Sequence, residues 1–82
     1  MEKEIYLLTT QSCTKCPNIK KWAKDLNVDV TILDVENDEL GGDITVDLGI
    51  MSVPTIVDNR TGTPKAHVGE GLSFAFLHEN KN

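Results

Sequence analysis

The stretch Cys13-Thr14-Lys15-Cys16 contains the two cysteines of this 82-residue sequence, and the segments on either side of it indicate the fold. Residues 4–9 form a short apolar, β-branched run that is typical of a buried strand. Residues 13–26 carry apolar side chains at i, i+3, i+4 and i+7 spacing, which predicts an amphipathic helix. A thiol at the start of that helix meets unpaired N–H groups and the positive end of the dipole, which favour the thiolate. Since two cysteines this close can also close a disulfide loop, the stretch predicts a redox site.

Composition and charge narrow the class of protein. Hydrophobic residues make up 39% and charged residues 26% of the sequence, which is ordinary for one small globular domain over residues 1–82. The net charge of −5 disfavours nucleic acid and an anionic membrane surface as partners. No segment approaches the roughly 20 apolar residues of a membrane span, and residues 1–4 show no export signal. We therefore expect a cytoplasmic monomer whose cysteines are kept reduced, so that a catalytic or metal-binding pair is favoured over a structural bridge.

The rest of the sequence alternates strand-like and helix-like segments. Gly and Asn residues between 36 and 42 suggest a loop, and Gly49 is well placed to end a short helix that begins near residue 43. Turn residues at 59–64 join two strand-like runs into a hairpin. The predicted strands are residues 4–9, 28–35, 53–58 and 65–69, and the predicted helices are residues 13–26, 43–48 and 72–78.

This order of elements, β-α-β-α-β-β-α, predicts an α/β fold. The first two strands are joined across a helix, so they should be parallel with a right-handed crossover. The hairpin then adds antiparallel strands. We expect a four-stranded mixed sheet with helices on both faces.

In this order of elements the chain resembles the thioredoxin and glutaredoxin superfamily. Two segments carry the resemblance, residues 10–17 with the cysteines followed by Pro17, and residues 49–57 with the sequence GIMSVPTIV. The first is similar to the C-x-x-C-P motif of small, glutaredoxin-sized thioredoxins. The second is similar to the segment that carries the family's cis-proline. The resemblance implies a thioredoxin fold.

The resemblance also implies an activity, that of a thiol–disulfide oxidoreductase serving electron transport and cell redox homeostasis. Cys13 would be the nucleophile toward disulfide-containing protein substrates, and Cys16 would be the resolving thiol. Pro54 would lie in cis beside the two sulfurs. Val53 would offer its backbone groups to an extended substrate segment, and Gly69 would bring its backbone close to the same groove.

The two residues between the cysteines complete the expected site. Thr14 and Lys15 are assigned to substrate contact, and the charge of Lys15 could also stabilise the thiolate. The resemblance assigns no metal ligand, and no cofactor beyond the redox-active Cys13–Cys16 disulfide.

The sequence departs from the family patterns where an electron donor would bind. Glutaredoxins have a lysine before the motif for the glutathione carboxylate, but here residues 9–11 are Thr, Thr and Gln. Glu70 stands between two glycines where the other end of glutathione would be held. Both differences favour a thioredoxin-type reductase over glutathione as the electron donor. In addition, Leu7 takes the place of the buried acid of thioredoxins, and Ser12 that of a common tryptophan.

Other classes of protein use the same cysteine spacing. Small copper chaperones place a C-x-x-C after their first strand because thiolates suit Cu(I), but their order is β-α-β-β-α-β, and we expect no strand after the last helix here. A zinc or iron–sulfur site bridging two copies would take two cysteines from each. A static disulfide is a further interpretation. His67 or His78 would act as ligand or base only if the fold brought one beside Cys13.

Overall fold

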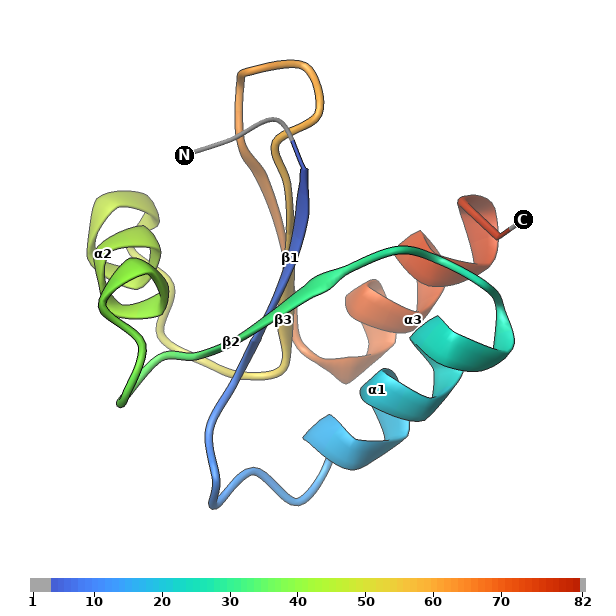
Figure 1. Ribbon diagram of the computed structural model, residues 1–82, viewed down its shortest axis with the longest axis horizontal. Coiled ribbons are helices and arrows are strands. Elements are labelled where there is room, and N and C mark those ends of the chain that lie inside the picture. Colours follow the sequence, from blue (N-terminus) through green and yellow to red (C-terminus); the bar gives the residue numbers. More distant parts are fainter. Residues whose placement is uncertain (1–3, 82) are drawn as a thin grey trace.

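Three helices cover the two faces of a four-stranded sheet in the computed structural model, which describes residues 4–81 (Figure 1). Residues 1–3 and 82 belong to the expected domain but lie outside the described residues. The prediction of no export signal rests largely on residues 1–3 and therefore also lies outside them. The strands are β1 (Ile5–Thr9), β2 (Thr31–Asp34), β3 (Thr55–Asp58) and β4 (Lys65–Val68), and the helices are α1 (Cys16–Asp25), α2 (Glu39–Leu48) and α3 (Glu70–Glu79).

The sheet has the order β2-β1-β3-β4 and is mixed, as predicted. The first two strands are parallel and joined by α1, with Tyr6 opposite Thr31. The strand β3 runs antiparallel to β1, and the hairpin adds β4 antiparallel to β3. Figure 1 shows α1 and α3 on one face of the sheet and α2 on the other. The predicted α/β architecture, a four-stranded mixed sheet with helices on both faces, is therefore confirmed.

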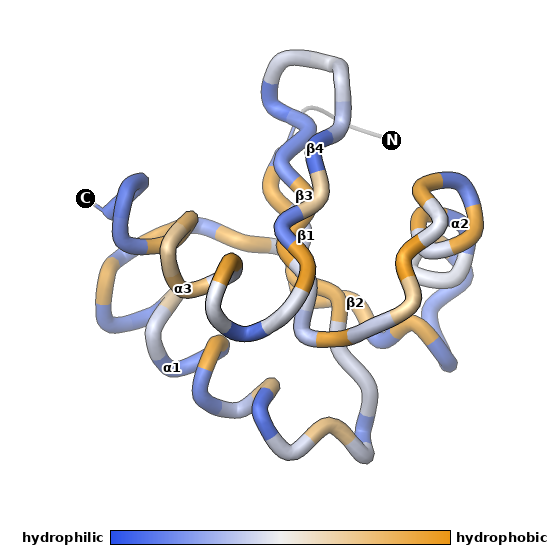
Figure 2. Tube along the Cα trace, turned by 180° about the vertical axis from the view of Figure 1, so that it is seen from behind, coloured by the Kyte–Doolittle hydropathy of each residue, from blue (hydrophilic) through white to orange (hydrophobic). Residues whose placement is uncertain are grey.

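The central strand β1 supplies side chains to both faces of the sheet. All five of its residues are buried, because successive side chains point to opposite faces and helices cover both. Leu7 packs with Ile19 and Phe76 under α1 and α3. Tyr6 and Leu8 belong to a second cluster under α2. Figure 2 shows hydrophobic residues, in orange, along the central strands β1 and β3.

The helix α1 begins at Cys16, three residues later than predicted. Pro17 lies in its first turn and has no N–H, so it cannot donate to the Cys13 carbonyl and extend the helix backwards. The residues before the helix form a turn, in which the Cys13 N–H donates to the Thr10 carbonyl at 3.3 Å. Cys13 therefore lies in a loop ahead of the helix.

The helix α2 begins at Glu39, four residues earlier than predicted, so Gly41 and Gly42 are helical and the predicted loop is wrong there. A Cβ atom on Gly41 would lie 3.0 Å from the Asp34 carbonyl oxygen. Glycine at this position lets α2 approach β2 closely, and this packing outweighs glycine's poor helix propensity. The predicted end of the helix is confirmed, since Gly49 caps it with φ +64°.

The remaining boundaries differ from the prediction by a few residues. The helix α3 begins at Glu70 rather than residue 72, after Gly69 has turned the chain at φ +94°. The strand β3 begins at Thr55, because the preceding Val53–Pro54 bond is cis and proline has no N–H for the ladder. Within residues 4–81, no helix has the length and apolar character needed to cross a bilayer.

Candidate functional site

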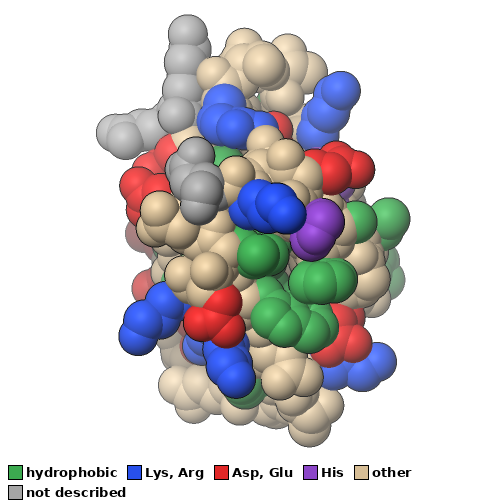
Figure 3. All heavy atoms as spheres, turned by 90° about the vertical axis from the view of Figure 1, so that its right-hand side faces the viewer, with side chains coloured by type: hydrophobic (Ala, Val, Ile, Leu, Met, Phe, Trp, Pro, Cys, Tyr) green, Lys and Arg blue, Asp and Glu red, His purple; other side chains and the backbone are tan. Residues whose placement is uncertain are grey.

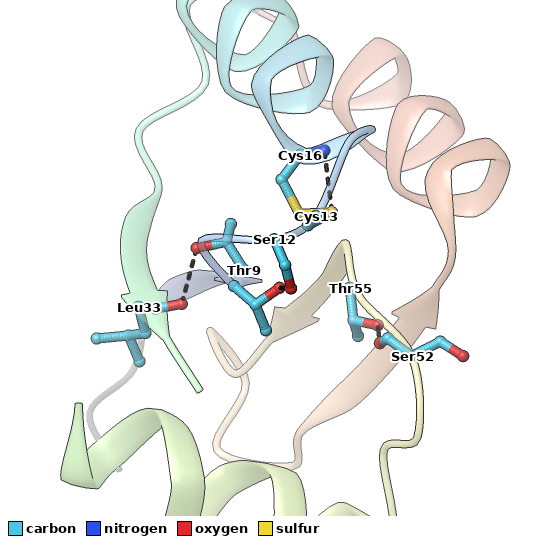
Figure 4. Close-up of a disulfide and its surroundings, with 8 residues drawn as sticks. Thr9, Ser12, Cys13, Cys16, Leu33, Ser52 and Thr55 are labelled. Carbon is cyan, nitrogen blue, oxygen red and sulfur yellow. Dashed lines mark hydrogen bonds between the residues drawn. A yellow bond between two sulfur atoms is a disulfide. The ribbon is translucent and has the colours of Figure 1, made fainter. Parts of the chain in front are cut away.

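The two cysteines meet where β1 ends and α1 begins, and they form a disulfide (Figure 4). Their Cα atoms are 5.5 Å apart. Cys16 lies in the first turn of α1 and is 1% exposed, whereas Cys13 is half-buried in the loop ahead of it. The difference in burial follows from the fold, because the inner face of α1 packs on the sheet and the loop does not. Cys13 is thus the more accessible of the pair.

A backbone donor connects the helix to the outer sulfur. The N–H of Cys16 points at the Cys13 Sγ atom, with N and Sγ 3.1 Å apart (Figure 4). This N–H belongs to the first turn of α1, where four donors lack partners inside the helix and the dipole is positive. The sequence reasoning placed Cys13 inside the helix, which is wrong. The structure still gives its sulfur a donor from the helix N-terminus.

The turn at residues 52–55 faces the disulfide, as Figure 4 shows. The Val53–Pro54 peptide bond is cis, which confirms that expectation. Two hydrogen bonds hold the turn in place. The buried Thr55 hydroxyl donates to the Ser52 carbonyl at 2.6 Å, and the Gly69 N–H donates to the Pro54 carbonyl at 2.9 Å. Gly69 is therefore next to the cis-proline as expected, but its N–H is occupied by Pro54.

The other expected contact residues lie on the outer surface of the cysteine loop. Thr14 and Lys15 are both exposed, and Lys15 occupies the position just before α1 without capping it through its side chain. Ser12 is exposed as well, and its hydroxyl lies 3.4 Å from that of Thr10. The loop on either side of the half-buried Cys13 is therefore exposed.

The two histidines are engaged elsewhere. The His67 ring on β4 packs on the Phe76 ring, with centroids 4.7 Å apart, and His78 on α3 lies near Phe74. Among residues 4–81, no three His, Cys, Asp or Glu side chains gather as a metal site would require.

Sequence reasoning missed two features of this region. The first is the Thr55 hydroxyl; its position directly after Pro54 in a buried strand was the signal that could have found it. The second is a pocket of about 140 Å³ beside the cis-proline turn. Its lining comes from four separate segments, which only the folded chain brings together: Thr10, Val35, Thr45, Ile50, Met51, Ser52 and Val53.

This combination of a mixed four-stranded sheet, a cysteine pair at a helix start and a facing cis-proline defines a thioredoxin-type protein. The glutaredoxin family model matches residues 5–61, which include both cysteines and the cis-proline turn. The chain belongs to the glutaredoxin family. A search of curated protein sequences returned no match.

Solved structures of thioredoxin-like proteins share the fold. A point mutant of the thioredoxin-like protein BC3987 is 22% identical with a TM-score of 0.75, over 95% of this chain and 97% of that one. Unmutated BC3987 is 24% identical with a TM-score of 0.72, over 90% and 99%. Thioredoxin 1 of the thermophilic eubacterium Thermosipho africanus is 19% identical with a TM-score of 0.57, over 92% of each chain. At these identities the likeness concerns the fold alone.

Proposed function

We propose that this protein is a dithiol carrier that reduces disulfides in other proteins through a cycle at Cys13 and Cys16. The observation that carries the proposal is the Cys13–Cys16 disulfide at the start of α1, opposite the cis-proline turn. Membership of the glutaredoxin family supports a thiol–disulfide oxidoreductase role at the level of the family. The proposed setting is the cytoplasm, where a cycling pair would spend most of its time reduced.

The proposed reaction moves two electrons from the protein to its substrate. The Cys13 thiolate attacks one sulfur of the substrate disulfide; a mixed disulfide forms, and the other substrate sulfur leaves as a thiolate that takes up a proton. The Cys16 thiol loses its proton and attacks the Cys13 sulfur. The substrate's second sulfur then leaves, and the Cys13–Cys16 disulfide remains. An external dithiol must reduce this disulfide before the next cycle.

The division of labour follows from burial and hydrogen bonding. Cys13 is the half-buried sulfur, so it can reach a disulfide on another protein, whereas Cys16 at 1% exposure can reach only its neighbour. The Cys16 N–H, 3.1 Å from the Cys13 Sγ atom, would stabilise negative charge on that sulfur when it acts as nucleophile or leaving group.

We further propose that the substrate binds as an extended segment along Val53. This residue is half-buried and precedes the cis-proline in the turn that faces the disulfide. Main-chain hydrogen bonds to such a turn would align the substrate without selecting its sequence. The Thr55 hydroxyl, which holds the Ser52 carbonyl, would keep the turn in place.

The proposed electron donor is a flavin-dependent thioredoxin-type reductase rather than glutathione. Glu70 begins α3 directly after Gly69, whose N–H is bonded to the cis-proline carbonyl, so this acid stands close to the site. Glutathione carries two carboxylates, and an acid near the site repels them. Residues 9–11 also contain no lysine, so the ion pair that glutaredoxins form with a glutathione carboxylate is missing there.

Two assays test the function and the donor. Reduction of insulin with a thioredoxin reductase should be robust. Turnover of a small mixed disulfide, coupled to glutathione and glutathione reductase, should be weak. Failure of both, with dithiothreitol also unable to drive insulin reduction through the protein, would reject the proposed function. Metal analysis of the protein purified under reducing conditions tests the rival class, because a dithiol carrier should hold less than stoichiometric zinc, copper or iron.

A further inference from the structure

The pocket beside the cis-proline turn shares residues with the segments that carry the site. Val53, which lines it, also precedes the cis-proline, and Thr10 contributes both to the lining and to the turn that holds Cys13. The far wall comes from α2 and the segment after it, through Thr45 and Ile50. A substrate segment that follows Val53 would therefore pass the mouth of this pocket.

The lining favours an apolar group. Four of the seven lining residues are aliphatic or methionine: Val35, Ile50, Met51 and Val53. The Thr45 hydroxyl is already bonded to the Gly41 carbonyl at 2.7 Å, and the Thr10 hydroxyl lies 3.4 Å from that of Ser12. Met51 stands 93% exposed at the rim, and its unbranched side chain can adapt to an occupant. At about 140 Å³, the pocket suits one side chain of leucine size.

The stretch of chain that supplies most of the pocket lining is rich in acids. Residues 34–52 contain no basic residue and six acids, which are Asp34, Glu36, Asp38, Glu39, Asp43 and Asp47. The helix α1 on the opposite face of the sheet carries the exposed Lys20, Lys21 and Lys24, and Lys20 is near enough to Asp34 to contribute to the lowering of its pKa. Figure 3 views that face and shows basic and acidic side chains mixed around a group of apolar ones. A segment that approaches the pocket from the α2 side meets the acids of α2 and of the loop before it, and these favour a cationic segment.

We propose that this pocket selects substrates by holding an apolar side chain from a lysine- or arginine-containing segment while the adjoining disulfide meets Cys13. The inference rests on the proposed function, since it concerns the substrate of the same site. It assigns specificity to residues that no redox step uses, above all Thr45 and Met51. It is consistent with the weak use of glutathione that we propose, because the carboxylates of glutathione would meet the acids of α2 and the loop before it.

Peptide substrates test the selection directly with the unaltered protein. Each peptide carries one cysteine in a disulfide with nitrothiobenzoate. The protein is reduced beforehand and freed of dithiothreitol, which would itself cleave this disulfide, and the second-order rate constant of nitrothiobenzoate release gives kcat/KM. Leucine, alanine or asparagine is placed in turn at each of the two positions on either side of the cysteine, with lysine or glutamate as the flanking charge. At one position, leucine with lysine should raise kcat/KM about tenfold over alanine with lysine. The advantage of lysine over glutamate should shrink as salt is raised.

A pair of variants on α2 provides the structural test. Thr45→Leu adds bulk inside the pocket, whereas Val46→Leu adds it at the next residue, which is 79% exposed and lies outside the lining. The ratio of leucine-peptide to alanine-peptide kcat/KM should fall toward one in Thr45→Leu and stay near the unaltered value in Val46→Leu. Equal kcat/KM for leucine and alanine peptides at every position, or a preference for glutamate, would overturn the proposal.

Failure of this inference can be told apart from failure of the proposed function. Reduction of the nitrothiobenzoate dimer needs the cysteines but no peptide segment. If that small disulfide is reduced and the peptides are not discriminated, the pocket proposal is wrong and the redox function stands. If neither the small disulfide nor any peptide is reduced, the function itself is rejected and the pocket proposal with it.

Discussion

The backbone N–H of Cys16 donates to the Sγ atom of Cys13. The buried cysteine therefore contacts the accessible one through its main chain as well as through the disulfide. The distance between N and Sγ is 3.1 Å. Because this N–H belongs to the first turn of α1, it brings the positive end of the helix to the outer sulfur. Two experiments examine the asymmetry that follows.

Single serine variants should separate the roles of the two sulfurs. Cys16→Ser keeps the accessible nucleophile but removes the group that resolves the mixed disulfide, so it should accumulate a covalent complex with a protein substrate. Cys13→Ser should accumulate none, since Cys16 is 1% exposed. Mass spectrometry under non-reducing conditions measures both. Equal trapping by the two variants would refute the assignment.

The reduced protein should be alkylated first at Cys13. Its side chain is half-buried in a loop, whereas that of Cys16 is enclosed in the first turn of α1. Peptide mapping after short iodoacetamide pulses from pH 5 to 9 gives the two rates. Unfolding the protein should bring the rates together, which is the control, and equal rates in the folded protein would contradict the geometry.

Thr55→Val should weaken substrate binding and stability together. The change removes the hydroxyl that donates to the Ser52 carbonyl at 2.6 Å and leaves that carbonyl without this partner, at a cost of about 1–3 kcal/mol in the free energy of unfolding. KM for insulin should rise because the Val53 turn is less firmly held. Thr55→Ser keeps the hydroxyl and should retain KM, so a matching rise in that variant would show that the hydrogen bond is not the cause.

Two neighbouring glycines of α2 should respond to alanine in opposite directions. A Cβ on Gly41 meets the Asp34 carbonyl oxygen at 3.0 Å, so Gly41→Ala should force α2 away from β2 and lower the free energy of unfolding by about 1–3 kcal/mol. A Cβ on Gly42 meets its nearest atom, the Val35 carbonyl oxygen, at 3.5 Å. Gly42→Ala should therefore raise the free energy of unfolding by about 0.5–1 kcal/mol, because alanine has the higher helix propensity. Urea titrations of both variants decide the point.

The ion pair between Asp58 and Arg60 should account for part of the loss of folding stability at acidic pH. The Arg60 guanidinium donates to both carboxylate oxygens, at 2.9 and 3.0 Å, and these hydrogen bonds lower the pKa of Asp58 below its ordinary value. Since the folded-state pKa is depressed, the resulting stability is present above the unfolded-state pKa and is lost as pH falls through the folded-state value. Arg60→Gln should make the free energy of unfolding depend less on pH below about 4.

The control for this experiment is Lys81→Gln, which removes one positive charge from an exposed site outside the Asp58 pair. This variant should leave the pH dependence of the free energy of unfolding below about pH 4 almost unchanged. A residual slope is expected in both variants, because the pKa of Asp34 is also lowered, chiefly by its hydrogen bond from the Asn37 side chain. The same pH dependence in Arg60→Gln and in the unaltered protein would refute the role given to the pair.

Local sequence was sufficient for the features that depend on short-range chemistry. The uninterrupted apolar run in β1 predicts a strand buried on both faces, and Gly49 predicts the end of α2 because only glycine adopts a positive φ there at no steric cost. The cysteine pair between a strand and a helix predicts a redox site, since two cysteines this close can close a disulfide loop. The order of elements predicts the parallel pairing of β1 and β2, because a helix connects them, and the short turn after β3 predicts the antiparallel hairpin with β4.

Tertiary structure decided what depends on contacts between distant segments. Gly41 and Gly42 have loop-like propensity, yet they are helical because α2 gains more from close packing on β2 than the glycines cost. The bond from Gly69 to Pro54 and the pocket between Thr10 and Thr45 join residues far apart in sequence. No local pattern encodes such contacts, because their free energy arises only when the sheet brings the segments together. The cysteine pair and the cis-proline could therefore be predicted from the sequence and its resemblance, whereas the pocket and the hydrogen bond between Gly69 and Pro54 could not.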